Sequence, residues 1–182
     1  FENYLEQLQN YLRGNEVEFE GDSDLGSLGL AGHSSSSRIS WIAGIQAKVP
    51  VDVAATGPRV IAAAARHADR ISLNVGADVE RVRWGMDVAR DARVEAGITG
   101  DIPFTAYISL VVHDDPEEAM RIGAGQVSLF ARFSAMYGRV VGPASVEQQQ
   151  VLEEIHRSYD MQQHGRGAGT QESAVTGEFA RN

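Results

Sequence analysis

The chain has 182 residues, of which 43% are hydrophobic, and it carries a formal net charge of -9 with no cysteine. A chain of this length can bury one sizeable core, so we expect a single domain over residues 1–182, and its acidic balance argues against a nucleic-acid partner, which would require a basic face. The lack of cysteine excludes disulfides, thiolate metal sites and a cysteine nucleophile, and it fits a reducing cytoplasm.

The first predicted element is a helix over residues 2–13. Its apolar side chains recur at spacings of three and four residues, and Gly14 can adopt the left-handed conformation that closes a helix. The helical pattern starts without a capping residue, and the last residues stop without a cap or a strand. We therefore expect further chain on both sides.

The stretch 21–37 is rich in glycine and serine and lacks the periodicity of a packed element. It is predicted to be a flexible surface loop, which would act either as a connector or as a lid over a binding site. Residues 165–182 are predicted to form a poorly ordered tail.

The most informative part of the chain predicts a buried strand that turns sharply into a helix. Residues 51–55 form a short, mostly apolar run, which Gly57 and Pro58 end. Pro58 suits the first position of a helix, and an apolar stripe follows it at helical spacing. The amides of Arg59 and Val60 and the guanidinium of Arg59 would then point past the carboxyl end of the strand, where a phosphate fits.

A second strand–helix unit follows directly. A strand over residues 70–75 is closed by Gly76, and Asp78 caps a helix that runs to about Ala96. The inward-facing residues of that helix are predicted to be Val79, Val82, Met86 and Ala89.

The third unit is an alternating strand over residues 104–112 and a helix that opens at residues 114–118 with a capping aspartate, a proline and two glutamates. Tyr107 and Ser109 lie on the face of this strand opposite Ile108, and we expect them to pack in the core. The longest apolar run, within residues 106–112, is far shorter than the roughly 20 residues that a bilayer requires. We therefore predict a soluble, cytoplasmic protein with no membrane contact.

Three strand–helix units in a row predict a parallel sheet with right-handed crossovers, either a doubly wound sheet or part of an eight-stranded barrel. In both architectures ligands bind at the carboxyl ends of the strands. Residues 55–59, 74–77 and 113–115 are therefore expected to lie on one rim. A final helix is predicted over about residues 146–161, because Ser145 and the glutamine three residues later have the spacing of a capping box.

Three ordered segments of the chain carry a resemblance to a known family. They read Pro-Val-Asp-Val-Ala-Ala-Thr-Gly-Pro-Arg-Val-Ile (50–61), Ala-Asp-Arg-Ile-Ser-Leu-Asn-Val-Gly-Ala (68–77) and Val-His-Asp-Asp-Pro-Glu-Glu-Ala (112–119). Together with later pieces at 132–138 and 159–165, they resemble the bacterial-luciferase-like monooxygenase superfamily. Within it the chain is most similar to the coenzyme F420-dependent oxidoreductases related to methylenetetrahydromethanopterin reductase.

The resemblance implies a partial TIM (β/α)8 barrel, of which this chain holds the middle and later strand–helix units. In that family the loop after the fifth strand gives backbone amides to the cofactor phosphate, and the rim after the next strand lies near the cofactor. The first strands of such barrels carry the usual catalytic acid or histidine and have no counterpart here, so the catalytic residues are left unassigned. The implied cofactor-binding residues are Ala55, Thr56, Gly57, Pro58, Arg59, Asn74, Val75 and Gly76.

The implied activity is hydride transfer between coenzyme F420 and a small-molecule organic substrate. One alternative is an FMN-dependent monooxygenase that incorporates molecular oxygen, and another is a non-catalytic binding or assembly module derived from the barrel. A homodimer is also expected. The apolar faces of the helices over 123–137 and 146–161 would either form its contact or cover the barrel wall.

The remaining candidate side chains divide into structural and functional interpretations. His67 is interpreted as structural, because the end of a helix favours a cation, whereas His113 on the predicted rim is a functional candidate. Asp114 and Asp115 are interpreted as helix caps, and the histidines share no ligand spacing, so no metal site is predicted. Three arginines are expected to form surface ion pairs, with contact to an anionic ligand as the alternative: Arg132, Arg139 and Arg157.

Overall fold

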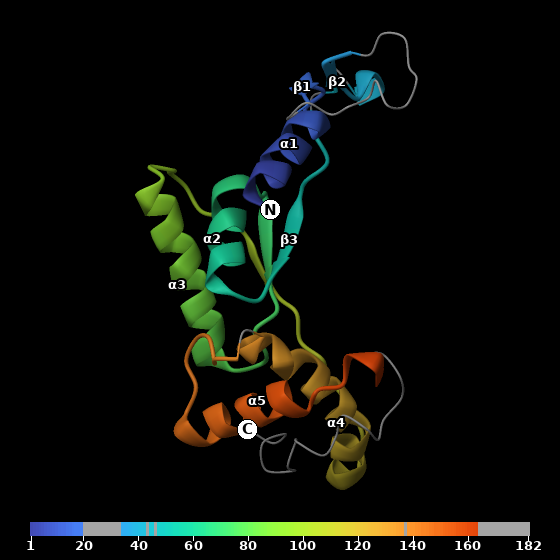
Figure 1. Cartoon of the computed structure of the whole chain (residues 1–182), viewed down its shortest axis with the longest axis vertical. Coiled ribbons are helices and arrows are strands. Elements are labelled where there is room, and N and C mark those ends of the chain that lie inside the picture. Colours follow the sequence, from blue (N-terminus) through green and yellow to red (C-terminus); the bar gives the residue numbers. More distant parts are fainter. Residues whose placement is uncertain (20–33, 43, 46, 137, 164–182) are drawn as a thin grey trace.

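The computed structural model describes residues 1–19, 34–42, 44–45, 47–136 and 138–163 of the chain. Its helices and strands form two halves along the longest axis of the molecule (Figure 1). The upper half contains α1 (Glu2–Leu12), β3 (Asp52–Ala55), α2 (Pro58–His67), β4 (Arg70–Leu73), α3 (Val79–Glu95) and β5 (Phe104–Ala106). The lower half contains α4 (Pro116–Ala131), η3 (Arg132–Ala135), α5 (Val146–Ser158) and η4 (Met161–Gln163).

A parallel sheet in the order β3-β4-β5 forms the centre of the upper half. Val53 lies opposite Ile71 in one strand pair, and Ile71 lies opposite Phe104 in the next. Helices follow each strand, so the predicted parallel α/β arrangement is confirmed. The partial TIM barrel stays a prediction. The buried cluster between the sheet and the helices α2 and α3 includes Val53, Ala55, Ile61, Ala64, Ile71, Leu73 and Ala89.

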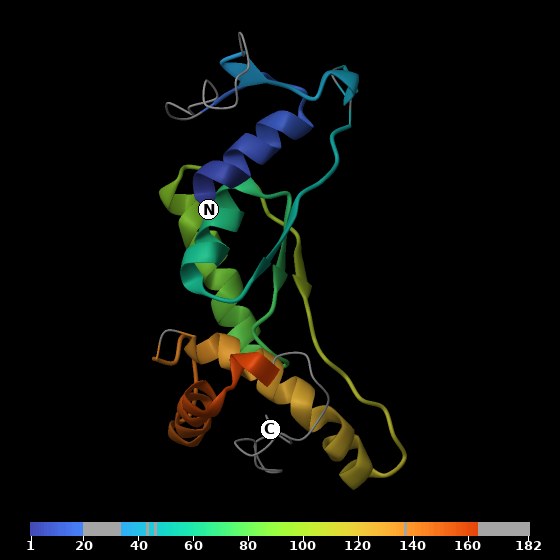
Figure 2. The same ribbon diagram turned by 45° about the vertical axis from the view of Figure 1, so that its right-hand side comes forward.

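The two faces of this sheet differ in what covers them. Helices α2 and α3 pack on the face that carries the buried residues (Figure 2). Asp52 and Ala54 alternate with the buried residues of β3 and are exposed on the opposite face. On that face the hydroxyl of Ser72 donates a hydrogen bond to Asp52 Oδ2 at 3.0 Å. Among the described residues, helices therefore cover only one face of a sheet type that is normally buried on both.

The helices begin where their local signals predict. Pro58 is at the first position of α2, and Asp78 Oδ1 caps α3 by accepting from the amides of Glu80 and Arg81 at 2.7 and 3.3 Å. In α5 the predicted capping box is present, with the amide of Ser145 donating to the side chain of Gln148. The helix itself ends at Ser158, which is three residues before the predicted end.

Polar contacts attach α1 to the end of α2. Arg66 donates from Nε to Glu2 Oε1 at 2.6 Å, and His67 Nε2 lies 3.0 Å from the same oxygen. The hydrogen bond from Arg66 is the largest influence on Glu2 and lowers the pKa of its carboxyl from 4.5 to about 2. The Gln9 amide also donates to the carbonyl of His67 at 2.6 Å. These contacts agree with the structural interpretation of His67.

The carboxylate of Asp69, two residues after the end of α2, accepts hydrogen bonds from three donors. Burial acts to raise the pKa of Asp69, but hydrogen bonds from Lys48, from the amide of Val51 and from Gln9 outweigh it and hold the pKa below its ordinary value. Lys48 also forms an ion pair with this carboxylate. These contacts fix the start of β3 against the connection between α2 and β4.

The predicted loop and tail fall largely outside the described residues. Residues 20–33 and 164–182 are not described, and Ser36–Ser37 form the short strand β2, which pairs antiparallel with β1 (Val17–Glu18). The loop prediction is therefore wrong at Ser36 and Ser37, and its residues 21–33 lie outside the described part of the chain. Among the residues that the structure describes, no helix has the length and apolar character needed to cross a membrane.

The predicted strand over residues 104–112 is wrong beyond its first three residues. Only Phe104–Ala106 pair in the sheet, and Leu110 and Val112 are 80% and 86% exposed. The cause is the length of the neighbouring strand: β4 ends at Leu73, whose carbonyl accepts from the amide of Tyr107 at 2.9 Å. Among the described residues, no strand continues beside the chain after that point. The segment continues in an extended form into the lower half (Figure 2).

The predicted inward face of α3 is wrong at its first position. Val79 is exposed, and the buried residues of this helix are Arg81, Gly85, Ala89 and Ala92. Close packing explains the small residues, because a Cβ added at Gly85 would lie 3.1 Å from the Leu73 side chain. The helix therefore turns a stripe of small residues, with one arginine, toward the sheet and the lower half.

Candidate functional site

The turn between β3 and α2 brings the predicted cofactor residues to the carboxyl edge of the sheet. The carbonyl of buried Ala55 accepts from the amide of Asn74 at 2.9 Å, so the ends of β3 and β4 are adjacent. Gly57 precedes α2 in an extended conformation, and a Cβ built on it would meet nothing within 4 Å. Residues 55–59 and 74–76 are therefore neighbours, with open space at the Cβ position of Gly57.

The third segment expected on this rim lies elsewhere. His113 is exposed, and its Nδ1 accepts from the amide of Asp115 at 3.0 Å. This turn is at the far end of the extended segment, where the chain enters α4 (Figure 2). The prediction that residues 113–115 share a rim with the other two segments is wrong. Asp115 instead caps α4 by accepting from the amide of Glu117 at 2.9 Å, as its cap interpretation predicted.

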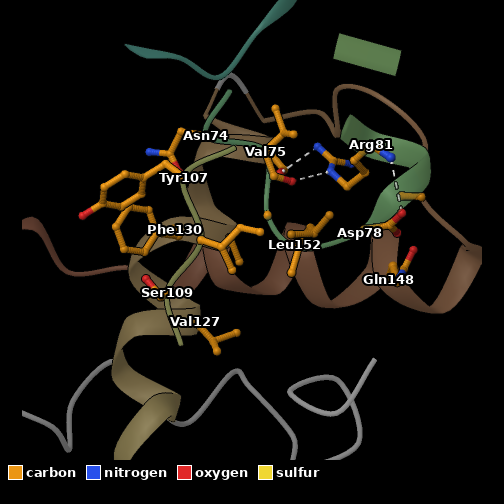
Figure 3. Close-up of a pocket in the computed structure, with 16 residues that line it drawn as sticks. Asn74, Val75, Asp78, Arg81, Tyr107, Ser109, Val127, Phe130, Gln148 and Leu152 are labelled. Atoms are coloured by element: carbon orange, nitrogen blue, oxygen red, sulfur yellow. Dashed lines mark hydrogen bonds between the residues drawn. The ribbon is translucent and has the colours of Figure 1, made fainter. Parts of the chain in front are cut away.

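A pocket of about 260 Å³ opens below the carboxyl ends of β4 and β5. Three of the predicted residues line it, Asn74, Val75 and Gly76, whereas residues 55–59 do not. Helices α4 and α5 with η3 close the lower side (Figure 3). The full lining consists of Asn74, Val75, Gly76, Ala77, Asp78, Arg81, Tyr107, Ile108, Ser109, Val127, Phe130, Ala131, Ser134, Ala144, Gln148 and Leu152.

Arg81 joins the two halves at one end of this pocket. Its side chain is buried, with only 7% of the residue exposed. Its Nε donates to the carbonyl of Val75 at 3.1 Å, and its two terminal nitrogens donate to three acceptors of the lower half. Burial lowers the pKa of Arg81, and the nearby charge of Asp78 acts in the opposite direction. The lower-half acceptors are the Ser134 hydroxyl at 2.9 Å and the carbonyls of Val141 at 2.8 Å and Pro143 at 2.6 Å.

A second contact between the halves lies beside Arg81. Gly142 adopts a positive φ of 83°, and a Cβ added there would lie 3.0 Å from ring atoms of Trp84 on α3. Only a glycine permits this close approach without displacement of the ring. Together, Arg81 and the Trp84–Gly142 contact hold the connection between η3 and α5 against α3 at one end of the pocket.

Comparison with known proteins identifies the family. The family model described as luciferase-like monooxygenase matches residues 1–181. The chain belongs to the luciferase-like monooxygenase family. No curated protein matches the chain. At the level of the family, the match supports an oxidoreductase or monooxygenase.

In this luciferase-like chain the arginines considered as ligand contacts have different surroundings. The Arg132 guanidinium carbon lies 4.6 Å from the ring centre of Phe133 and 4.7 Å from that of Tyr159, and its buried Nε has no hydrogen-bond partner among the described residues. Arg157 forms the expected surface ion pair with Glu154. No group of three or more metal-ligating side chains occurs in the described part of the chain.

The apolar helix faces in the lower half are partly used within the chain. Leu152 and Ile155 of α5 are buried, whereas Met136 is exposed. The first two residues are therefore unavailable for a contact between subunits. A homodimer of this luciferase-like chain stays a prediction.

The sequence interpretation missed most of the pocket lining. Tyr107 and Ser109 were expected in the core, but both are exposed residues of the pocket wall. Arg81 was not considered, although a signal for it exists. It falls at helical spacing with Gly85 and Ala89, and a charged residue within a stripe of small residues indicates a buried polar contact.

Proposed function

We propose that this chain is an oxidoreductase of the luciferase-like family that transfers a hydride between coenzyme F420 and an organic substrate. The observation that carries the proposal is the meeting of residues 55–59 with residues 74–76 at the carboxyl edge of a parallel sheet. Ligands of parallel α/β folds bind at that edge. The proposal assigns the cofactor phosphate to the β3–α2 turn.

The chemistry of the turn fits a phosphate. A helix leaves the amides of its first turn without intrahelical acceptors, and its dipole places partial positive charge there. The first helical amide that bonds within α2 is that of Ile61, which donates to the carbonyl of Gly57 at 2.9 Å. Thr56 would add a hydroxyl, and Arg59 an exposed cation. When bound, F420 supplies the hydride chemistry, and this chain supplies binding and orientation.

A flavin is the second candidate. The family description names a monooxygenase, which favours FMN with incorporation of molecular oxygen. Both cofactors carry a phosphate, so the turn alone does not separate them. Titration of the protein with each cofactor separates the two candidates. Preferential binding of F420 supports the F420-dependent oxidoreductase, and preferential binding of FMN supports the FMN-dependent monooxygenase.

The position of the phosphate is tested by adding a charge to the turn. Gly57→Asp places a carboxylate in open space, and the backbone at Gly57 has an ordinary φ of -132°, so the variant is expected to fold. Repulsion of the phosphate should weaken F420 binding by about tenfold or more. Val94→Asp adds the same charge at an exposed site on α3 and is the matched control.

Two outcomes contradict the proposal. If Gly57→Asp and Val94→Asp bind F420 equally well, the phosphate does not occupy this turn. If the wild-type chain binds neither F420 nor FMN, the non-catalytic module becomes the better interpretation.

A further inference from the structure

The pocket between the two halves presents balanced charge to a ligand. Its lining includes one acidic and one basic side chain, Asp78 and Arg81. Both are already engaged, because Asp78 Oδ1 accepts two amides of α3 and Arg81 donates to four protein acceptors. The two charges are opposite, and that of Asp78 acts on Arg81, so they leave no net charge in the lining. An ionised ligand would therefore lose hydration here without gaining a net counter-charge. The electrostatics therefore favour an uncharged ligand.

The opposite end of the pocket is aromatic, with polar groups beside it. The rings of Tyr107 and Phe130 lie 5.7 Å apart, and Asn74 and Ser109 are next to them, away from Arg81 (Figure 3). Within the described residues, the side chains of Asn74 and Ser109 make no hydrogen bond. Apolar walls with a few polar groups that set orientation are typical of small-molecule sites.

The size of the pocket excludes larger partners. Its volume of about 260 Å³ is slightly below the range of roughly 300–1,000 Å³ that is usual for ligand pockets. A helix is about 10 Å across with its side chains, so a helical peptide does not fit. A compact organic molecule does.

We propose that this pocket binds an uncharged, mainly apolar organic molecule that hydrogen-bonds to Asn74 and Ser109. The inference rests on the proposed function in one respect, because it assigns this molecule as the substrate. Residues 74–76 border both the pocket and the turn that would hold the cofactor phosphate. The pocket would thus place the substrate beside the cofactor.

The test compares three probes of similar size on the 182-residue chain without cofactor: benzyl alcohol, benzoate and benzylammonium. Benzyl alcohol is expected to bind with a dissociation constant on the order of 1 mM and to shift the amide resonances of Gly76, Tyr107 and Ser109. The two ions should bind at least ~10-fold more weakly. Equal or tighter binding of either ion overturns the proposal, and so does the absence of binding by benzyl alcohol.

Two variants locate the probe. Phe130→Ala removes the aromatic wall and should weaken benzyl alcohol binding by about tenfold. Ser109→Ala removes a hydroxyl that makes no hydrogen bond in the described part of the chain, so the variant should fold and bind benzyl alcohol about threefold more weakly. Tyr4→Ala, at an exposed aromatic residue of α1, should bind as the wild type does. If Phe130→Ala does not fold, Ser109→Ala decides, and unchanged affinity overturns the proposal.

Addition of cofactor separates this inference from the proposed function. Benzyl alcohol should stay bound at saturating F420 or FMN, and its displacement would mean that the pocket holds the cofactor, which overturns the substrate assignment. If benzyl alcohol binds and neither cofactor does, the proposed function fails while the pocket remains a site for uncharged ligands.

Discussion

The two halves of the molecule are stabilised by different interactions. In the upper half, Ile61, Ile71 and Leu73 are fully buried between the sheet and its helices, whereas Ile155 is the large side chain buried to this degree in the described part of the lower half. The lower half is instead attached by the hydrogen bonds of Arg81 and by the contact of Gly142 with Trp84. Apolar burial builds the upper half, and a few specific contacts position the lower one.

This difference has a consequence for the pocket, which lies between the halves. Its upper wall consists mainly of residues 74–78 and 107–109, which follow strands β4 and β5. The sheet to which they are attached should be rigid, because many buried contacts would have to break for it to move. The lower wall of the pocket depends on Arg81 and on one glycine. We therefore expect changes in the upper half to alter global stability and changes at the contact between the halves to alter the pocket.

The largest expected effect comes from the core of the upper half. Ile61→Ala removes a fully buried side chain that packs near Leu73 and Gly85, and it should lower the free energy of unfolding by about 2–5 kcal/mol. Urea denaturation measures this loss. Val94→Ala, at an exposed residue of α3, should change stability by less than about 0.5 kcal/mol. A similar loss in both variants would contradict the description of the core.

Arg81→Met should give the next largest loss of stability, and the loss should be concentrated in the lower half. The substitution leaves three carbonyls and the Ser134 hydroxyl without their donor, which should cost about 2–3 kcal/mol, partly offset by removal of a buried charge. Amide hydrogen exchange should accelerate in η3 and α5 and stay unchanged in α2 and β4.

Arg93→Met is the matched control for that change. Arg93 is on the same helix and also donates to backbone carbonyls, but its acceptors, Ala65, Thr99 and Gly100, belong to the upper half. Arg93→Met should lower the free energy of unfolding by about 1 kcal/mol, and amide hydrogen exchange in α5 should not become faster. If Arg93→Met loosens the lower half as much as Arg81→Met does, Arg81 is not the specific link between the halves.

The same contrast explains which elements could be predicted from the sequence. The starts of α2, α3 and α5 were predicted because their signals are local: Pro58, the Asp78 cap, and the capping box at Ser145 lie within a few residues of the groups they satisfy. The parallel order of the strands followed from three successive strand–helix units. The adjacency of residues 55–59 and 74–76 followed in turn from that parallel order.

What could not be predicted depends on distant partners. Alternation over residues 104–112 is a local property, but a strand also needs a neighbour, and β4 stops at Leu73. Arg81 lies 53 to 62 residues away from its acceptors in the lower half. Neither the pocket nor its closure was therefore predictable from residues near Arg81.

Gly142→Ala tests the contact of Gly142 with Trp84, and we expect a smaller loss of free energy of unfolding than for Arg81→Met. The new methyl group would lie 3.0 Å from the Trp84 ring and would occupy a backbone with positive φ, so about 1–3 kcal/mol should be lost. Gly44→Ala is the matched control, because Gly44 also has a positive φ of 89° but open space around its Cβ position. The difference in urea stability between the variants measures the contact with Trp84, and equal losses would show that backbone strain alone is responsible.

The smallest expected effect is at the opposite end of the upper half, where Glu2 joins α1 to α2. The Arg66 hydrogen bond lowers the Glu2 pKa to about 2 in the folded chain, so the unfolded chain binds a proton at higher pH than the folded one. The stabilisation is therefore complete above about pH 4.5 and is lost as the pH falls toward 2. Because the Glu2 side chain is 40% exposed, Glu2→Gln should cost only about 1 kcal/mol or less at neutral pH.

The difference between wild type and Glu2→Gln isolates this contribution, since other carboxylates such as Asp69 lose stabilisation in acid in both proteins. The free energy of unfolding in urea should be higher for wild type than for Glu2→Gln at pH 7. This difference should disappear as the pH falls to 2, and it should also be smaller in 1 M salt. Glu6→Gln, on the same helix but without an ion pair among the described residues, should show no such difference. If the difference between wild type and Glu2→Gln persists unchanged at pH 2, the charge of Glu2 contributes nothing to the position of α1. Neutral contacts would then attach this helix, namely buried Leu5 and the Gln9 hydrogen bond to His67.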